Sequence, residues 1–435
     1  MLQRIEAWRG SPRGIARFEE PLDAMELLPW LAAQKHPVKG YWSDRNGELE
    51  VAALGEADLV RGSEADGIDA VFKALNERWA ANAGDFRYFG GFRFDTKRPI
   101  DDAWRPFGSY RFILPLAEIV RRGNVWTLAC NLNAGQADAA DSVTRCLSEL
   151  FWTGRPESDA PLQPLGRKDE PDLAGWRNAI DAALQAIARA DVEKVVLARR
   201  SAFLFPAPLD AVDILQRISR YTDRCSLFCG SYSGQVAFIG ASPERLYRRT
   251  GRDIDSEAVA GTRRRGKTDA EDDSLGRELF ASAKDRDEHD VVVRKVIRAL
   301  QPLCESVDHS SMPTIVKLRH VQHLVTPIKG RLKEGVADAE VLRALHPTPA
   351  VGGEPSDAAL AMIRNLEQFD RGWYAAPVGW IGRDAADFVV ALRCGVVAGN
   401  ALCLFSGAGI VAGSKAEDEW GEIENKMRGF LNLFS

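Results

Sequence analysis

Residues 388–411 form the most apolar region of the chain, and their pattern constrains the fold more than any other segment. Arg393, Asn400 and several glycines interrupt the region, and valine is more frequent in it than leucine. A membrane-spanning helix needs about 20 consecutive apolar residues, whereas β-branched residues favour strands. The region therefore predicts two buried strands, with Arg393 inside one of them, and no membrane span.

Length and composition are those of a folded, soluble protein. The chain has 435 residues, of which 45% are hydrophobic and 27% charged. This length allows two or three domains, or one large interleaved α/β body. The net charge of −5 argues against a nucleic-acid-binding protein, which usually concentrates Lys and Arg on one face. The basic run 263–267 is followed by four acidic residues within 269–273, which favours a mixed-charge surface loop.

The cysteines and the N-terminus indicate a cytoplasmic location. The seven cysteines are scattered and lack the paired spacing of a zinc site, so reduced thiols fit best. The first ten residues contain no apolar run long enough for a signal peptide.

The chain divides by pattern into two regions. Short β-like runs separated by glycine and asparagine fill residues 1–165, as in an antiparallel sheet. A polar, proline-containing stretch, 155–171, marks the boundary, and residues 166–435 mix helices with strands. We expect residues 1–165 to be a β-rich part of the same body. The clearest predicted strands are 49–54, 86–94, 126–130, 194–198 and 236–240, and predicted helices lie near 176–187 and 209–218.

The last predicted helix carries two carboxylates and an ammonium on one edge. At about 100° per residue, Glu419, Glu422 and Lys426 lie close together beside an apolar stripe that runs from Trp420 to Phe434. A carboxylate pair at this spacing can bind a hard cation such as Mg²⁺, and the lysine can meet an anionic substrate. An ordinary solvated helix face would have the same pattern, and this helix alone does not distinguish a cation-binding face from a solvated one.

A second predicted helix repeats this arrangement. Asp285 and Glu288 lie three residues apart beside an apolar stripe that includes Val293 and Leu300. The two helices could face each other across one cation, although a solvated face remains an equal alternative.

Three further positions suggest catalysis or anion binding. Lys194 opens an apolar strand, where burial would favour the neutral amine and so a general base, although a strand-end lysine can also reach solvent. Glu244 follows a strand end and could act as a general acid or be an exposed turn residue. Arg393 needs an anionic partner if it is buried, and Gly409 lets a backbone N–H approach an anion.

Nine segments, which follow one another along the chain as they do in the family, resemble the chorismate-utilising enzymes. This family includes isochorismate synthases, salicylate synthases and the large subunits of anthranilate and aminodeoxychorismate synthases. Residues 88–91 and 94–95 match more loosely. The resemblance implies an α/β (α+β) fold in which two large, mostly antiparallel sheets pack together and are flanked by helices. The matching segments are 194–199, 242–246, 260–263, 285–289, 321–324, 346–349, 391–394, 407–409 and 419–426.

The resemblance also implies a role for each candidate residue. Lys194 would activate water for attack at C2 of chorismate, and Glu244 would protonate the departing C4 hydroxyl. Glu288 and Glu422 would bind Mg²⁺ directly, with Glu419 and the shorter Asp285 beside them. The expected substrate-binding residues are Gly261, Thr262 and Lys426 at the ring carboxylate, Arg393, Tyr374 and Gly409 at the enolpyruvyl carboxylate, His323 at the ring, and Thr348.

In having lysine at position 194, the chain resembles the family members that use water instead of ammonia. No glutamine amidotransferase subunit is therefore expected. Segments 346–353 and 371–374 resemble isochorismate synthases of menaquinone or siderophore pathways more than salicylate synthases. The resemblance therefore predicts an isomerase that converts chorismate to isochorismate. A salicylate synthase and a non-catalytic metabolite-binding homologue are the alternatives, and retention of both Lys194 and Glu244 argues against the second.

Overall fold

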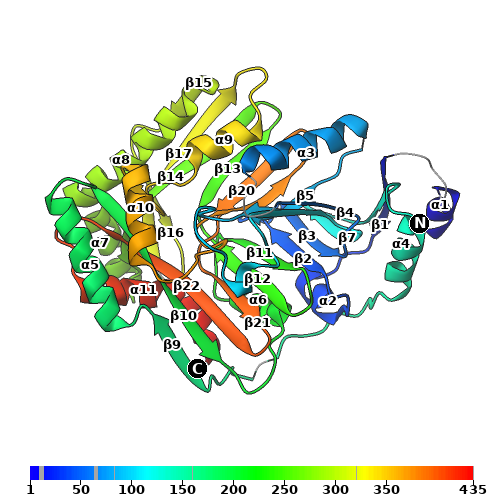
Figure 1. Cartoon of the computed structure of the whole chain (residues 1–435), viewed down its shortest axis with the longest axis horizontal. Coiled ribbons are helices and arrows are strands. Elements are labelled where there is room, and N and C mark those ends of the chain that lie inside the picture. Colours follow the sequence, from blue (N-terminus) through cyan, green and yellow to red (C-terminus); the bar gives the residue numbers. More distant parts are fainter. Residues whose placement is uncertain (9–13, 63–66, 83, 159, 320, 435) are drawn as a thin grey trace.

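Two antiparallel β-sheets form the framework of the computed structural model, which describes residues 1–8, 14–62, 67–82, 84–158, 160–319 and 321–434 (Figure 1). Among these residues the larger sheet has twelve strands. Its order is β1 (Ile15–Leu22), β8 (Val125–Asn133), β7 (Ala117–Arg122), β3 (Leu49–Leu54), β2 (Lys39–Ser43), β11 (Ser226–Ser231), β12 (Val236–Ser242), β21 (Cys394–Ala398), β22 (Ala401–Ile410), β10 (Lys194–Leu204) and β18 (Gly353–Glu354), and β9 (Gly166–Glu170) also pairs with β10.

The second sheet has ten strands within the described ranges. Its order is β15 (Cys304–His309), β17 (Val321–Leu332), β14 (Asp253–Arg264), β13 (Arg245–Thr250), β20 (Ala385–Val390), β19 (Pro377–Ile381), β5 (Tyr88–Phe92), β6 (Tyr110–Leu114) and β4 (Asp58–Arg61), and β16 (Thr314–Lys317) also pairs with β17.

Each sheet joins one block of strands from residues 1–165 to one block of strands from the later residues. In the larger sheet β2 pairs with β11, and in the second sheet β5 pairs with β19. Residues before and after the polar stretch 155–171 therefore share two hydrogen-bonded sheets.

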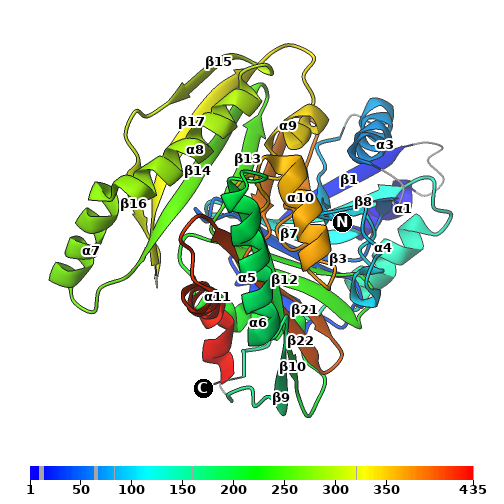
Figure 2. The same cartoon turned by 60° about the vertical axis from the view of Figure 1, so that its left-hand side comes forward.

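Helices cover the outer faces of the sheets. Helices α5, α10 and α11 pack against β10 or β22, and α2 and α6 pack beside β11, β12 and β3. Helices α7 and α8 lie along β14 and β17, as Figure 2 shows. The helices are α1 (Leu2–Trp8), α2 (Leu27–Ala33), α3 (Ile68–Ala81), α4 (Ala139–Ser148), α5 (Leu173–Ala188), α6 (Ala211–Ser219), α7 (Asp269–Ala281), α8 (Ala283–Leu300), α9 (Asp338–Leu345), α10 (Ser356–Leu366) and α11 (Ala416–Leu431), with 3₁₀ turns η1 (Asp102–Trp104) and η2 (Asn432–Phe434).

The core lies where the two sheets face each other. Aromatic rings interlock there at contact distance, with 5.3 Å between the ring centres of Phe107 and Trp373 and 5.3 Å between those of Trp104 and Phe238. A cavity of about 40 Å³ among these layers is lined by residues of both sheets, including Trp42 and Val378. The predicted fold class, two large antiparallel sheets packed together and flanked by helices, is confirmed.

The apolar region that begins at residue 388 differs from its prediction in one respect. It contains the end of β20 and all of β21 and β22, so three strands share it. Arg393 lies in the turn before β21, with φ at +46°, and not inside a strand. The turn is held by its backbone, since the Ala241 N–H donates to the Arg393 carbonyl at 3.1 Å. No helix in the described part of the chain is both long and apolar enough to cross a bilayer.

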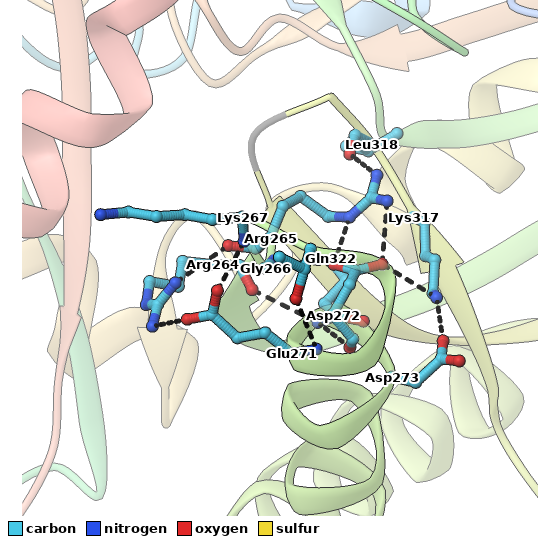
Figure 3. Close-up of polar contacts among 11 residues, drawn as sticks. Arg264, Arg265, Gly266, Lys267, Glu271, Asp272, Asp273, Lys317, Leu318 and Gln322 are labelled. Atoms are coloured by element: carbon cyan, nitrogen blue, oxygen red, sulfur yellow. Dashed lines mark hydrogen bonds and ion pairs between the residues drawn. The ribbon is translucent and has the colours of Figure 1, made fainter.

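The basic run 263–267 is neutralised within its own neighbourhood. Arg265 donates to both oxygens of Asp272, at 2.7 and 2.9 Å, and Lys317 pairs with the same carboxylate at 2.9 Å (Figure 3). Arg264 pairs with Glu271. The predicted mixture of charges is therefore present, but the predicted loop is wrong for most of the segment, because the run begins in β14 and the acidic residues belong to α7.

Candidate active site

Lys194 is the first residue of β10, and its side chain lies against β22. The register pairs Val196 with Gly409. A Cβ at Gly409 would lie 2.8 Å from Lys194 Cε, so only glycine leaves room for the lysine. Lys194 Nζ donates to Glu288 Oε1 at 2.8 Å, and the lysine side chain is 14% exposed. The lysine therefore reaches across from β10 to α8 instead of into bulk solvent.

Glu244 lies in the turn between β12 and β13, close to Lys194. Its side chain keeps partial solvent contact, but the surrounding protein atoms raise the pKa of Glu244 to about 8. The negative charge of Glu257 contributes to this rise in the pKa, whereas the ammonium groups of Lys194 and Lys426 oppose it. Glu244 is consequently protonated at neutral pH and can donate a proton.

The two helices predicted to carry acidic residues do flank this site. Ser282 caps α8, and Val293, Val296 and Leu300 are buried on its inner face. Helix α11 has Glu417, Asp418 and Glu419 in its first turn, where the helix dipole favours them, and it buries Ile423 and Met427. Both apolar stripes therefore dock as the sequence predicts, and they place the acidic edges beside the site.

Each predicted metal ligand except Glu419 is paired with a protein cation. Glu288 accepts from Lys194, Glu422 pairs with Lys426 at 2.6 Å, and Asp285 accepts from Arg263 at 2.7 Å. Burial and the neighbouring Glu422 carboxylate raise the pKa of Glu419, although a hydrogen bond with Ser414 opposes this. Among the described residues, no three metal-binding side chains are gathered closely enough to form a complete site.

One wall of the site is cationic and polar, and it is formed by Lys426, Arg393 and His323. Lys426 Nζ donates to the Gly407 carbonyl at 2.9 Å. Burial, together with the charges of Arg393 and Lys426, lowers the pKa of His323 to about 3, so this histidine is neutral. Within the described structure, the guanidinium of Arg393 makes a single side-chain hydrogen-bond contact, with Cys225 Sγ at 4.0 Å. Its guanidinium is thus available to an anionic ligand.

The remaining predicted residues surround this wall. His323 Nδ1 and Thr262 Oγ1 lie 3.0 Å apart. Gly261 has φ at +76°, and a Cβ there would meet Asp285 Cβ at 3.4 Å. The Tyr374 hydroxyl would lie 2.9 Å from a Cβ at Gly407, so Tyr374 reaches the same strand of the site.

Thr348 is buried, and its hydroxyl has no hydrogen-bond partner in the described structure. It lies in the loop before β18, which meets β10 where Val196 N–H donates to the Gly352 carbonyl at 2.9 Å. No contact joins Thr348 directly to the other candidate residues, so its role stays a prediction.

Two charged residues next to Glu244 were not predicted from the sequence. Arg45 donates to both oxygens of Glu257, and Glu257 accepts from the backbone of Arg245. The partners of the ion pair are 212 residues apart, and no local pattern marks either of them. A close contact between distant segments of this kind becomes visible only in the folded chain.

The fold and site together define an α/β scaffold of the enzyme type, in which an acid, an amine and several cations come from neighbouring ends of β10, β22, α8 and α11 and from the turn after β12. The family model described as "Chorismate binding enzyme" matches residues 3–435. The chain therefore belongs to the chorismate-binding enzyme family.

Individual relatives match over nearly their whole length. The chain is 30% identical to isochorismate synthase MenF of Bacillus subtilis, over 96% of this chain and 92% of the relative. It is 34% identical to the salicylate biosynthesis isochorismate synthase of Pseudomonas aeruginosa, over 97% and 90%. The solved structure of MenF, the menaquinone-specific isochorismate synthase from Escherichia coli, matches with a TM-score of 0.89 at 31% identity, over 100% of this chain and 99% of that one.

Proposed function

We propose that this chain is an isochorismate synthase, an isomerase that converts chorismate to isochorismate. Its similarity to isochorismate synthases over nearly their full length supports this activity. The observation that carries the proposal is the pairing of a protonated carboxyl with an amine, because Glu244 has a pKa of about 8 and lies close to Lys194.

The two groups account for the proton transfers of the reaction. Lys194 takes a proton from water as its oxygen bonds to C2 of chorismate, and the ring double bond shifts. The C4–O bond breaks, and Glu244 gives its proton to the departing hydroxyl, which leaves as water. One water is added and one is lost, so the reaction is an isomerisation.

Cationic and polar groups would bind the two carboxylates of the substrate. We assign Lys426, Gly261 and Thr262 to the ring carboxylate, and Arg393, Tyr374 and the Gly409 N–H to the enolpyruvyl carboxylate. His323, neutral at physiological pH, would contact the ring, and Thr348 completes the proposed set. A guanidinium without a carboxylate partner supports this assignment, since Arg393 meets no acidic side chain in the described structure.

The acidic edges of α8 and α11 suit Mg²⁺, which prefers carboxylate oxygens. We propose Glu288 and Glu422 as direct ligands, with Glu419 and Asp285 beside them. The bound ion would neutralise the ring carboxylate. The crowding that raises the pKa of Glu419 beside Glu422 supports a cation at this position.

The ion pair between Lys194 and Glu288 has a consequence for the proposed base. An ammonium held by a carboxylate has no lone pair with which to accept a proton. We propose that Glu288, if it binds the metal, would give up its hydrogen bond with Lys194 and leave the amine free to meet the attacking water. The supporting observation is that the same carboxylate oxygen contacts Lys194 Nζ at 2.8 Å.

Incubation of the purified protein with chorismate and Mg²⁺, followed by chromatographic separation of products, tests the proposed activity. We expect isochorismate, and we expect Lys194→Ala to lower kcat by about 10²- to 10⁴-fold. Salicylate with pyruvate would instead indicate a salicylate synthase, and anthranilate formed only with ammonia would rule out the water-using assignment. Absence of any product while chorismate still binds would favour the non-catalytic homologue.

We further propose that the enzyme works in the cytoplasm and without an amidotransferase subunit. Seven free cysteine thiols support a reducing compartment. Full activity of the isolated chain, with water as the nucleophile, would support independence from a partner.

A further inference from the structure

We propose that Arg45 and Glu257 are positioning residues that hold the turn carrying Glu244 in place. The inference rests on the role of general acid proposed for Glu244. It brings a residue from the N-terminal part of the chain into the catalytic arrangement.

The ion pair contacts both neighbours of Glu244. Arg45 donates to Glu257 through two hydrogen bonds of 2.7 Å, the bidentate geometry that fixes both groups most firmly. Glu257 Oε1 also accepts the Arg245 backbone N–H at 2.9 Å, and Arg45 reaches the Pro243 carbonyl at 3.4 Å. The residues immediately before and after Glu244 are therefore both attached to one buried carboxylate and its arginine.

The backbone of Glu244 is held on its other side by β20. The Glu244 N–H donates to Ser242 Oγ at 3.3 Å, and Ser242 Oγ donates to the Val390 carbonyl at 2.5 Å. Val390 N–H donates in turn to the Glu244 carbonyl at 3.1 Å. With the arginine pair on one side and β20 on the other, the turn has little freedom to move the carboxyl.

Glu257 also acts on Glu244 through its charge. The charged and titratable groups that face Glu244 are Glu257 from β14, Lys194 from β10, Lys426 from α11, and Tyr374. Glu257 opposes ionisation of Glu244, whereas the two ammonium groups favour it. Removing the Glu257 charge should therefore lower the pKa of Glu244 and shorten the pH range in which it is an acid.

The first experiment measures kcat/KM against pH for the wild type and Glu257→Gln, with chorismate and Mg²⁺. The amide oxygen can still accept from Arg245 while the charge is lost. We expect the alkaline limb of the profile to move to lower pH by about 0.5 to 1 unit. Infrared difference spectra against Glu244→Gln, recorded over the same pH range without substrate, should show the same displacement in the carboxylic acid band of Glu244.

The second experiment tests the mechanical part of the proposal. Arg45→Met should lower kcat by about tenfold with KM changed by less than about twofold, because a loosened turn misplaces the acid without touching the substrate. Arg45→Lys keeps the charge but loses the two-pronged contact, so it should restore part of kcat. Near-ultraviolet circular dichroism establishes that each variant is folded.

Glu48→Gln is the matched control. It removes the ion pair of Glu48 with Arg248, a 2.9 Å contact on the exposed surface. Like the pair of Arg45 and Glu257, this contact joins the turn between β2 and β3 to the second sheet. This variant should keep the wild-type profile. If the wild type makes isochorismate and Arg45→Met keeps the wild-type kcat, the positioning role is overturned, and if Glu257→Gln leaves both the alkaline limb and the infrared band unmoved, the charge effect on Glu244 is overturned. If the wild type makes no isochorismate, the proposed function itself fails.

Discussion

At the scale of single residues, Gly409 leaves the space in which the end of the Lys194 side chain lies. The glycine has ordinary extended backbone in β22, so its importance lies in the space it leaves and not in its conformation. The atoms that a Cβ would meet are Lys194 Cε at 2.8 Å and Nζ at 3.4 Å. These belong to the flexible end of a side chain, so an added methyl group should displace the amine without disturbing the strand.

We therefore predict that Gly409→Ala lowers kcat by about 10- to 100-fold with little change in thermal stability, since misplacement of a catalytic group by about 1 Å has this effect. Steady-state kinetics and a thermal melt check both parts. Gly421→Ala is the control, because nothing lies within 4 Å of a Cβ there and alanine favours the helix. Unchanged turnover in Gly409→Ala would contradict the proposed role of Lys194.

At the scale of elements, a buried ion pair attaches β10 to the segment between α10 and β19. Arg371 donates to Glu367 and to the carbonyls of Val196 and Val351, while Glu367 accepts the Ala198 N–H at 2.8 Å. Both charged side chains are 3% exposed. The pair thus fixes the strand that begins with Lys194.

Arg371→Met should destabilise the protein by about 3–5 kcal/mol, because it leaves the Glu367 carboxylate buried without its cation. Denaturant unfolding monitored by fluorescence measures the loss. The control, Arg331→Met, breaks an exposed pair with Asp253 and should change stability by less than about 0.5 kcal/mol. Similar losses in the two variants would show that burial of the pair does not govern its effect.

Helices α8 and α11 together should determine metal affinity. We predict that Glu422→Gln weakens Mg²⁺ binding by at least about tenfold in calorimetric titrations of the protein without substrate. Glu417→Gln is the control on the same helix, because Glu417 is exposed and pairs with Arg177. Equal Mg²⁺ affinity in Glu422→Gln and the wild type would remove Glu422 from the proposed ligands.

At the scale of the whole molecule, the two parts of the sequence depend on each other. Strands β2 and β5 belong to residues 1–165, but they pair with β11 and β19 from the later part. Removal of the first part would expose the edges of β11 and β19 and would remove Trp104 and Phe107 from the aromatic core. We propose that residues 1–165 are an integral part of the catalytic body and not a separable domain.

The fragment 166–435 should consequently aggregate when it is produced alone, and co-production with 1–165 should restore folding and activity. Gel filtration and near-ultraviolet circular dichroism measure this. A protease site inserted beside the exposed Gln163, and cut after folding, is the control for breaking the chain. A fragment 166–435 that is monomeric and natively packed would refute the proposal.

Patterns that arise within one element could be read from the sequence. The predicted strand 49–54 coincides with β3, and the apolar stripes of α8 and α11 are buried as their spacing requires. The hydrophobic periodicity predicts these elements correctly because one face of each element meets the core. Arg393 shows the limit, since the end of β20 and the left-handed turn after it depend on hydrogen bonds to other strands.

The sequence alone thus determined, through ordered segments, the family to which the chain belongs, and it predicted which residues bear the chemistry. Only the tertiary structure decided how these residues are paired: Lys194 with Glu288, Lys426 with Glu422, and Arg45 with Glu257. Side-chain contacts within a helix or strand follow from its repeat, but contacts between elements depend on how the sheets and helices pack. The raised pKa of Glu244 has the same origin, because neighbours from distant elements bury its carboxyl and surround it with charged groups.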